Sequence, residues 1–396
     1  EINKIILALK KINILSTKNF LSELNKLKKL ENKQKKIKDS KMYFIDKIYW
    51  LVEDCKRYGT LPFAGLARNA FIATEILNSL VNENIISKEK SNNFLSEIKS
   101  ITSEIYDDWK NLSKKLFLKR HGHLRPNTYE ITSKNYKSGH SIYFSKSLNK
   151  DAVTHLKNKK VFFTNNEKKK INIFLKKFKS DLNFDQFIRY LKESIKMREY
   201  SKHIFTKSID LLFENIMALC NRFDLSHKDA SFLNINKITE LYYNLSSQNI
   251  EEIFKEEIKK NKKQYKINYN FKLPETIINE NDIYFYYENQ NKINFVGDKI
   301  ITSDVISLEN TNININKIRN KIVCIESADP GYDFIFFAKI KGLITKYGGV
   351  NSHMSVRCSE LGLPAAIGVG ESQFNNIISS KKIELDCQAK TINFLR

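Results

Sequence analysis

The apolar residues of this chain repeat with the period of a helix over most of its length, from about residue 15 to residue 265. Residues that recur three, four or seven positions apart fall on one face of a helix, and that face is normally buried. Three such stripes are Phe44, Ile48, Leu51 and Cys55; Leu95, Ile98, Ile105, Trp109, Leu112 and Leu116; and Phe205, Ile209, Leu212 and Ile216. The second stripe predicts one long helix. The N-terminal two thirds of the chain are therefore expected to be mainly helical.

The pattern changes after a strongly charged segment, residues 246–268. Short apolar runs such as DIYFYYE, KIVCIES and LITK follow it, and runs of this length predict strands. We therefore predict an α+β multidomain protein with a mainly helical region over residues 1–262 and a compact β/α domain over residues 263–396. Within the helical region, residues 119–165 form an irregular insert, because Gly122 and Pro126 break helices.

The chain is basic, with 67 Lys and Arg against 44 acidic residues and a formal net charge of +23. Such an excess ordinarily indicates nucleic acid or an anionic surface as partner. Here the lysines are scattered among Asn and Ile without interleaved aromatic residues, so no nucleic-acid partner is predicted. A basic nucleic-acid-binding protein remains the alternative of another class.

Five widely spaced cysteines without a CxxC pair indicate neither a disulfide framework nor a zinc site. The pair His121 and His123 lacks carboxylate support, so no metal site is predicted. No apolar run is long enough to span a membrane, and a cytoplasmic location is expected. Because the first residue is Glu, the chain is expected to be part of a longer polypeptide.

Glycine is concentrated in one stretch. Seven of the 12 glycines fall between Gly331 and Gly370. Glycine allows tight turns and close approach of the backbone to a ligand. A loop-built site is therefore expected there.

This stretch contains GLITKYGGVNSHMSVRCSELGLPAAIGVG. It predicts a strand over 342–345, a Gly-Gly turn, helix caps at Asn351 and Ser352, and a helix that ends near Leu361. His353 then lies in the first helical turn, where free N–H groups and the helix dipole favour a phosphoryl group on the ring. Neutral imidazole is nucleophilic near pH 7, so His353 is the candidate phosphoryl carrier.

The residues around His353 can bind phosphate oxygens. The backbone of Gly348 and Gly349 can approach them closely, and Thr345, Ser352 and Arg357 can donate hydrogen bonds. Arg357 lies one helical turn after His353 and therefore shares its face.

The string resembles the phosphohistidine swivelling domain of the phosphoenolpyruvate-utilising enzymes. The resemblance covers Thr345, the Gly-Gly pair, Ser-His, the Gly-Leu-Pro-Ala segment and a closing glycine. The family usually has Arg six residues after the histidine, where this chain has Ser359, and the arginine of this chain stands at position 357 instead. The segment ESADPGYDFIF resembles the strand and loop that lead into the family's domain, with Asp329 and Pro330 in the turn.

Three helical stretches resemble the L-glutamine kinases that supply the phosphoramidate decoration of capsular polysaccharide. They are LPFAGLARNAFIATEIL, HGHLRPNTYEIT and REYSKHIFTKSI, the last of which contains Lys202 and Thr206. The resemblance implies that the amide nitrogen of L-glutamine accepts the phosphoryl group, while ATP yields AMP and phosphate. A cation for the acceptor's carboxylate and polar partners for its amine and amide are needed. The candidate acceptor-binding residues are Arg68, His123, Arg125, Tyr129 and Arg198.

Nothing in residues 1–260 resembles an ATP-grasp site or a GxxxxGK[ST] loop. We therefore expect ATP and Mg²⁺ to be bound by an ATP-grasp domain that precedes residue 1 or belongs to a separate chain. Another acceptor, such as pyruvate, a sugar or an antibiotic, remains the alternative within the same mechanism.

Overall fold

The fold is given by a computed structural model that describes residues 2–98, 101–144, 161–177, 182–243, 249–271, 273, 277–284, 293–308, 315–350 and 352–395. The chain divides into two compact units. The first unit comprises residues 1–43, 50–123 and 155–212, and the second comprises residues 44–49, 124–154 and 213–396. The chain therefore passes repeatedly between the units, and the boundary near residue 262 stays a prediction.

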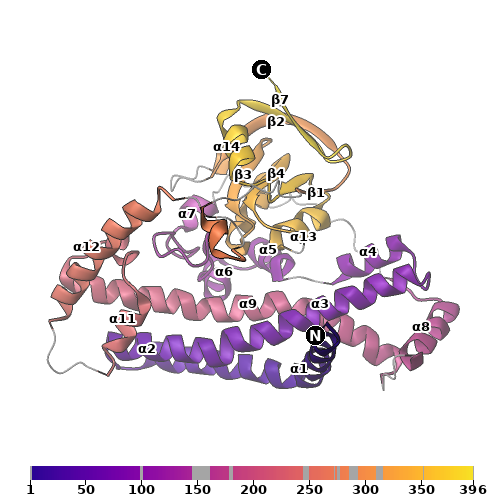
Figure 1. The fold of residues 1–396 in the computed structure, drawn as a ribbon, viewed down its shortest axis with the longest axis horizontal. Coiled ribbons are helices and arrows are strands. Elements are labelled where there is room, and N and C mark those ends of the chain that lie inside the picture. Colours follow the sequence, from indigo (N-terminus) through magenta and orange to yellow (C-terminus); the bar gives the residue numbers. More distant parts are fainter. Residues whose placement is uncertain are drawn as a thin grey trace. The chain divides into compact units, whose positions relative to one another are not determined.

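The first unit is helical (Figure 1). Its helices are α1 (Ile2–Asp39), α2 (Phe44–Cys55), the π-helix η1 (Lys56–Thr60), α3 (Leu61–Asn82), α4 (Lys88–Glu97), α5 (Ile101–Asn111), α6 (Lys114–His121), α8 (Asn165–Lys177) and α9 (Phe184–Cys220). Helices α2 and α9 each contain residues of both units. Apolar faces of α1 and α3 pack together through Phe20, Leu27 and Leu66. The helical character predicted for this region is confirmed.

Two of the three predicted stripes lie on single helices, α2 and α9. The prediction of one long helix from Leu95 to Leu116 was wrong, because three helices share that stretch. Ile98 is extended at the end of α4, and the side chain of Ser113 accepts a hydrogen bond from the Leu116 amide and starts α6. Such a serine cap competes with helix continuation.

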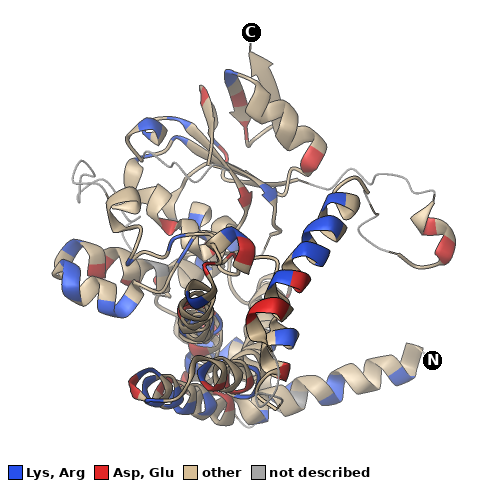
Figure 2. Cartoon of the chain, turned by 90° about the vertical axis from the view of Figure 1, so that its left-hand side faces the viewer, with Lys and Arg blue, Asp and Glu red and all other residues tan. Residues whose placement is uncertain are grey.

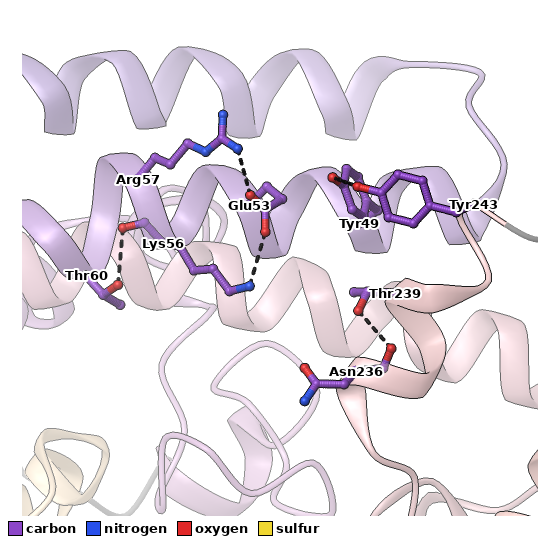
Figure 3. A network of polar contacts seen from close by, with 8 residues as sticks. All are labelled: Tyr49, Glu53, Lys56, Arg57, Thr60, Asn236, Thr239 and Tyr243. Carbon is purple, nitrogen blue, oxygen red and sulfur yellow. Dashed lines mark hydrogen bonds and ion pairs between the residues drawn. The ribbon is translucent and has the colours of Figure 1, made fainter.

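The π-helix η1 continues α2 directly. Glu53 near the end of α2 pairs with Lys56 at 3.1 Å and with Arg57 at 3.0 Å (Figure 3). The Cβ of any larger residue at Gly59 would lie 2.9 Å from the Cβ of Phe205, so glycine is needed where η1 meets α9.

The second unit contains short helices and the sheet. Its helices are α7 (His140–Tyr143), η2 (Asn221–Phe223), α10 (His227–Ala230), α11 (Ile235–Glu240), α12 (Ile250–Asn268), η3 (Glu280–Ile283), η4 (Ile315–Ile318), η5 (Pro330–Ala338), α13 (His353–Leu361) and α14 (Glu371–Ser379). The insert predicted to be irregular contains only α7 between residue 122 and residue 144. Residues 145–160 lie outside the described part.

The charged segment after residue 246 forms α12 where it is described. Asn249 caps this helix, and Phe254 and Ile258 are buried on one face. The carboxylate of Asp229 is paired with Lys262, and hydrogen bonds from Lys262 and Ser226 lower the pKa of Asp229 to about 2. The described part of the charged segment therefore packs as a helix.

The sheet has seven strands in the order β1-β5-β4-β3-β2-β6-β7. The strands are β1 (Asn294–Val296), β2 (Ile300–Ser307), β3 (Ile322–Ser327), β4 (Gly342–Tyr347), β5 (Ala365–Ile367), β6 (Lys382–Asp386) and β7 (Thr391–Leu395). Strands β2, β3, β4 and β5 are parallel, and the pairs with β1, β6 and β7 are antiparallel. The strands predicted from KIVCIES and LITK are β3 and β4. Of DIYFYYE, Asp282 and Ile283 lie in η3, and residues 285–288 lie outside the described part.

Both faces of the central strands are buried. Phe374 and Ile377 of α14 cover the face that carries Cys324 and Ile344. Alternate residues of a strand point to opposite faces, and Val323, Ile325 and Leu343 are also fully buried. This two-sided burial explains why the strands read as continuous apolar runs.

Lys and Arg alternate with Asp and Glu along many of the helices (Figure 2). In the first unit, the ion pairs Lys90–Glu167, Lys192–Glu97 and Lys196–Glu104 each join two different helices. Over the described residues, no helix combines the length and apolar character that a membrane crossing requires.

Candidate functional site

The strand, turn and helix predicted around His353 are confirmed. Strand β4 ends at Tyr347, and α13 begins at His353. The side chain of Ser352 accepts a hydrogen bond from the Ser355 amide at 3.3 Å and caps the helix. Gly362 ends the helix in the left-handed conformation, with φ of 59°. The second predicted cap, Asn351, lies outside the described residues.

The two turn glycines differ in what they require. Gly348 has φ of 145°, and a Cβ on it would lie 2.9 Å from side-chain atoms of both Ala328 and Ile367, so only glycine fits. Gly349 has no atom within 4 Å of the place where its Cβ would be. The space beside Gly349 is thus open to an approaching group.

Thr345 is fully buried and supports the loop that closes beside Gly348. Its Oγ1 accepts a hydrogen bond from the Gly368 amide at 3.0 Å, and its carbonyl accepts from Gly368 and Val369. Its hydroxyl proton can still be donated, since a hydroxyl both donates and accepts. Thr345 therefore holds the turn in shape in addition to its predicted contact with phosphate.

His353 is paired with a carboxylate. Its Nε2 lies 2.7 Å from Oδ1 of Asp333, which belongs to η5. Asp333 is fully buried, and 9% of His353 is exposed. The second oxygen of Asp333, Oδ2, has no hydrogen-bond partner among the described residues. A carboxylate at this distance orients an imidazole ring and stabilises its positively charged form.

Sequence reasoning missed Asp333. The signal was present, because Asp333 is the one acidic residue inside the apolar run GYDFIFFA, and a buried acid requires a partner. That the partner is His353 follows only from the packing of α13 beside η5.

Arg357, like His353, contacts the 3-10 helix η5. It is 1% exposed, and its guanidinium lies 5.7 Å from the centre of the Phe336 ring. Burial of an arginine in a protein interior requires compensation by polar or aromatic groups. Its role as a phosphate ligand stays a prediction.

His353, paired with Asp333, therefore lies at the start of α13, after the Gly-Gly turn that follows the buried parallel strand β4. Residues 318–390 match the family model of the PEP-utilising enzyme, mobile domain. This part of the chain is thus similar to the mobile domain of PEP-utilising enzymes. The matched residues, which we call the mobile domain, contain His353, Asp333 and both turn glycines, and the match supports phosphotransfer as the type of reaction. A comparison of the chain with curated proteins found no match.

Three of the residues predicted to bind the acceptor lie in the first unit. Arg68 is on the exposed face of α3 and donates to the Ser16 hydroxyl at 2.8 Å. The guanidinium of Arg198 on α9 lies 5.3 Å from the ring of Phe71, which is one turn along α3 from Arg68. Nε2 of His123 lies 3.0 Å from the carbonyl of His203, also on α9. Of the three resembling stretches, LPFAGLARNAFIATEIL lies on α3 and REYSKHIFTKSI on α9, whereas HGHLRPNTYEIT begins at the last residue of α6 and continues into the second unit.

The other two predicted residues, Arg125 and Tyr129, belong to the second unit. Arg125 is buried, donates from Nη1 to the Ser133 carbonyl at 3.2 Å, and stacks on Phe213 at 4.8 Å. Tyr129 is 62% exposed. The predicted set is therefore divided between the two units.

A buried histidine chain in the first unit was not predicted. Oδ2 of Asp108 lies 2.8 Å from Nε2 of His121, and Nδ1 of His121 lies 3.1 Å from Nε2 of His203. With Asp108 ionised and both rings neutral, each ring can donate toward Asp108, which leaves a lone pair on Nδ1 of His203. Among the described residues, this atom is buried without a hydrogen-bond partner. The signal in the sequence was that both histidines fall in the resembling stretches.

Burial affects the charge of these rings. It lowers the pKa of His203 well below the usual value, and it lowers the pKa of His121 although Asp108 acts in the opposite direction. Burial also opposes ionisation of Asp108, but hydrogen bonds from His121 and Arg120 hold the pKa of that carboxyl below its usual value. In the described part of the chain, no group of three or more His, Cys, Asp or Glu side chains is arranged to hold a metal ion.

We expect the first unit to lose stability as the pH falls below about 6.5, the usual pKa of histidine. The unfolded chain then binds protons on His121 and His203 that the folded chain does not, so the free energy of unfolding falls by up to about 1.4 kcal/mol per pH unit for each ring. Thermal unfolding between pH 8 and pH 5 measures this slope. The variant His203→Gln should have a shallower slope, and an equal slope in both proteins would contradict the assignment.

Proposed function

We propose that this protein is an ATP-dependent phosphotransferase in which His353 carries the phosphoryl group, and that the acceptor is the amide nitrogen of L-glutamine. The observation that supports it most strongly is the His353–Asp333 pair at the start of α13 in a PEP-utilising mobile domain. The imidazole attacks a phosphorus of ATP and forms an N–P bond while the bond to the AMP oxygen breaks and AMP leaves; water releases the outer phosphate. The N–P bond to His353 then breaks when the acceptor nitrogen attacks and gives up a proton.

The roles of the neighbouring residues follow from charge. A phosphoryl group on His353 carries negative charge that must be neutralised, since transfer depends on positioning and electrostatic stabilisation. The backbone amides of Gly348 and Gly349, the hydroxyls of Thr345 and Ser352, and the guanidinium of Arg357 are donors of the required kind. Asp333 keeps the imidazole ring oriented by accepting a hydrogen bond from its N–H group, and that proton stays on the ring during nucleophilic attack.

ATP and Mg²⁺ belong, in this proposal, to an ATP-grasp partner domain, and the reaction yields AMP and phosphate. On the acceptor side, Arg68 and Arg198 supply cations for a carboxylate, and His123, Arg125 and Tyr129 supply polar contacts. Phosphorylated glutamine would serve phosphoramidate modification of capsular polysaccharide in the cytoplasm. The resemblance of three helical stretches to L-glutamine kinases motivates this acceptor.

An acceptor panel tests the proposal. The protein joined with its ATP-binding domain is incubated with ATP, Mg²⁺ and glutamine, pyruvate, sugars or rifamycins in turn, and AMP release is measured. We expect AMP release to depend on glutamine, with a phosphoramidate signal in the ³¹P NMR spectrum of the product. AMP release that depends on another acceptor would keep the carrier mechanism and replace glutamine.

A further inference from the structure

The first turns of α1, residues 2–15, carry large apolar side chains that the described part of the chain leaves exposed. Every residue of this segment whose side chain is described is exposed. Its large apolar residues are between 42% and 75% exposed, and they are Ile2, Ile5, Ile6, Leu7, Leu9, Ile12 and Leu15. Farther along the same helix, Phe20 and Leu27 are buried with Leu66 of α3. The start of α1 therefore differs from the packed part of the helix that follows it.

Most of these exposed side chains share one face of the helix. An α-helix turns by about 100° per residue, so an arc of about 120° contains Ile2, Ile5, Ile6, Leu9 and Ile12. We name these residues the N-terminal apolar face. Leu7 and Leu15 lie outside the arc. A stripe of this width is the face that a helix normally buries, so a partner that covers it is required.

The charges at this end of α1 have one sign. Residues 2–22 contain Lys4, Lys10, Lys11 and Lys18 and no Asp or Glu. In Figure 2 the part of α1 beside the mark N carries blue and no red. By the same helical geometry, Lys4 and Lys11 lie roughly opposite the N-terminal apolar face, and Lys10 lies at its border. The segment therefore combines an apolar face with a basic one.

We propose that residues 2–15 bind the surface of an anionic lipid bilayer, with the N-terminal apolar face inserted at the boundary between headgroups and acyl chains. A basic helix with one apolar face is the kind that lies in this interface. The long stems of Lys4, Lys10 and Lys11 allow their ammonium groups to reach the lipid phosphates while the apolar side chains enter the hydrocarbon. This inference depends neither on the acceptor nor on the carrier role of His353.

Charge and composition favour a lipid surface over a protein partner. A second copy of the segment would place lysines beside lysines, and juxtaposed like charges oppose association. The cores of specific protein interfaces are enriched in aromatic residues, Met and Arg. The N-terminal apolar face contains only Ile and Leu, whose burial in fluid hydrocarbon requires no matching pocket. The excess of lysine complements the negative charge of an anionic bilayer.

Sedimentation with vesicles tests the proposal. The wild-type chain is mixed at low salt with vesicles of phosphatidylglycerol and phosphatidylcholine in equal parts, or of phosphatidylcholine alone. We expect binding to the anionic vesicles to be at least about tenfold tighter, because each lysine near an anionic surface contributes about fivefold. This binding should weaken as salt is added. Absence of binding to the anionic vesicles, or equal binding to both kinds, would overturn the proposal.

Two leucines provide a matched pair of variants. Leu9→Gln places an amide in the middle of the N-terminal apolar face, whereas Leu7→Gln makes the same change outside the arc. We expect the first variant to bind the anionic vesicles about tenfold more weakly, and the second to lose less than about threefold. Both leucines are exposed, so neither change should alter the thermal unfolding curve. Equal losses in the two variants would contradict insertion of a defined face.

A pair of double variants tests the contribution of charge. Lys10→Gln with Lys11→Gln removes two charges beside the N-terminal apolar face and should weaken binding to the anionic vesicles about 25-fold. Lys35→Gln with Lys36→Gln removes two exposed charges near the other end of α1, about 35 Å away, and should change binding less than about threefold. Equal losses would show that net charge, rather than this segment, binds the vesicles.

Two other partners of the face give different results. A dimer of the wild-type chain that Leu9→Gln dissociates, measured by light scattering, would assign the face to a second copy and overturn the proposal. Loss of vesicle binding when the protein is joined with its ATP-binding domain would assign the face to that domain and would overturn it as well. Vesicle binding that persists in the joined protein, with a monomeric wild-type chain, is the expected result.

Discussion

His353→Gln abolishes phosphoryl transfer in the expected outcome, because glutamine has no nucleophilic ring nitrogen. Its amide can still donate to Asp333, so the buried carboxylate keeps a hydrogen bond and the fold is retained. His353→Ala, in contrast, leaves Asp333 buried without this partner, and breaking such a pair costs about 3–5 kcal/mol of stability. Acid-labile labelling from radioactive ATP and glutamine phosphorylation are the measurements.

The matched control is His227→Gln. His227 starts α10 in the second unit, and its Nδ1 lies 3.4 Å from the Ile131 carbonyl. This variant should be labelled and should discharge as the wild type does. Glutamine phosphorylation that survives in His353→Gln, with a thermal unfolding curve that shows a folded protein, would exclude His353 as the carrier.

Asp333→Asn should slow loading of His353 about 100-fold, the lower end of the range for loss of a positioned acid or base. Asparagine has the same shape and can still accept a hydrogen bond from Nε2, but it has no charge to stabilise the ring as the N–P bond forms. Single-turnover labelling from ATP measures the rate. Because chemical phosphorylation by potassium phosphoramidate needs no ATP-binding domain, the same comparison can be made on this chain alone.

The control for Asp333→Asn is Asp304→Asn. Asp304 lies on β2 of the same sheet, is about half exposed, and is 3.8 Å from Lys321, so its charge is solvated and its loss should change little. A loading rate for Asp333→Asn within about threefold of this control would show that the carboxylate is a structural partner of the ring and not a contributor to the chemistry.

The fold class could be predicted from the sequence because the buried face of a helix or strand places apolar residues at regular intervals along the chain. The stripes on α2 and α9 predicted helices at the right places, and the continuous apolar runs KIVCIES and LITK predicted buried strands. The helix breaks between Leu95 and Leu116 were missed, since a serine cap such as Ser113 overrides an unbroken apolar period. The charged segment marks the change of pattern in the sequence, and only the structure shows that Phe254 and Ile258 give α12 a face to bury.

The sequence by itself determined His353, because the Gly-Gly turn, the serine cap and the helix end are local features that lie within a few residues of one another. Tertiary structure alone decided what His353 touches. Asp333 is 20 positions away along the chain, Tyr136 and its partner Gly331 are 195 apart, and His121 and His203 are 82 apart. Local periodicity reports which face of an element is buried, whereas the identity of the group that meets it is set by how separate elements pack.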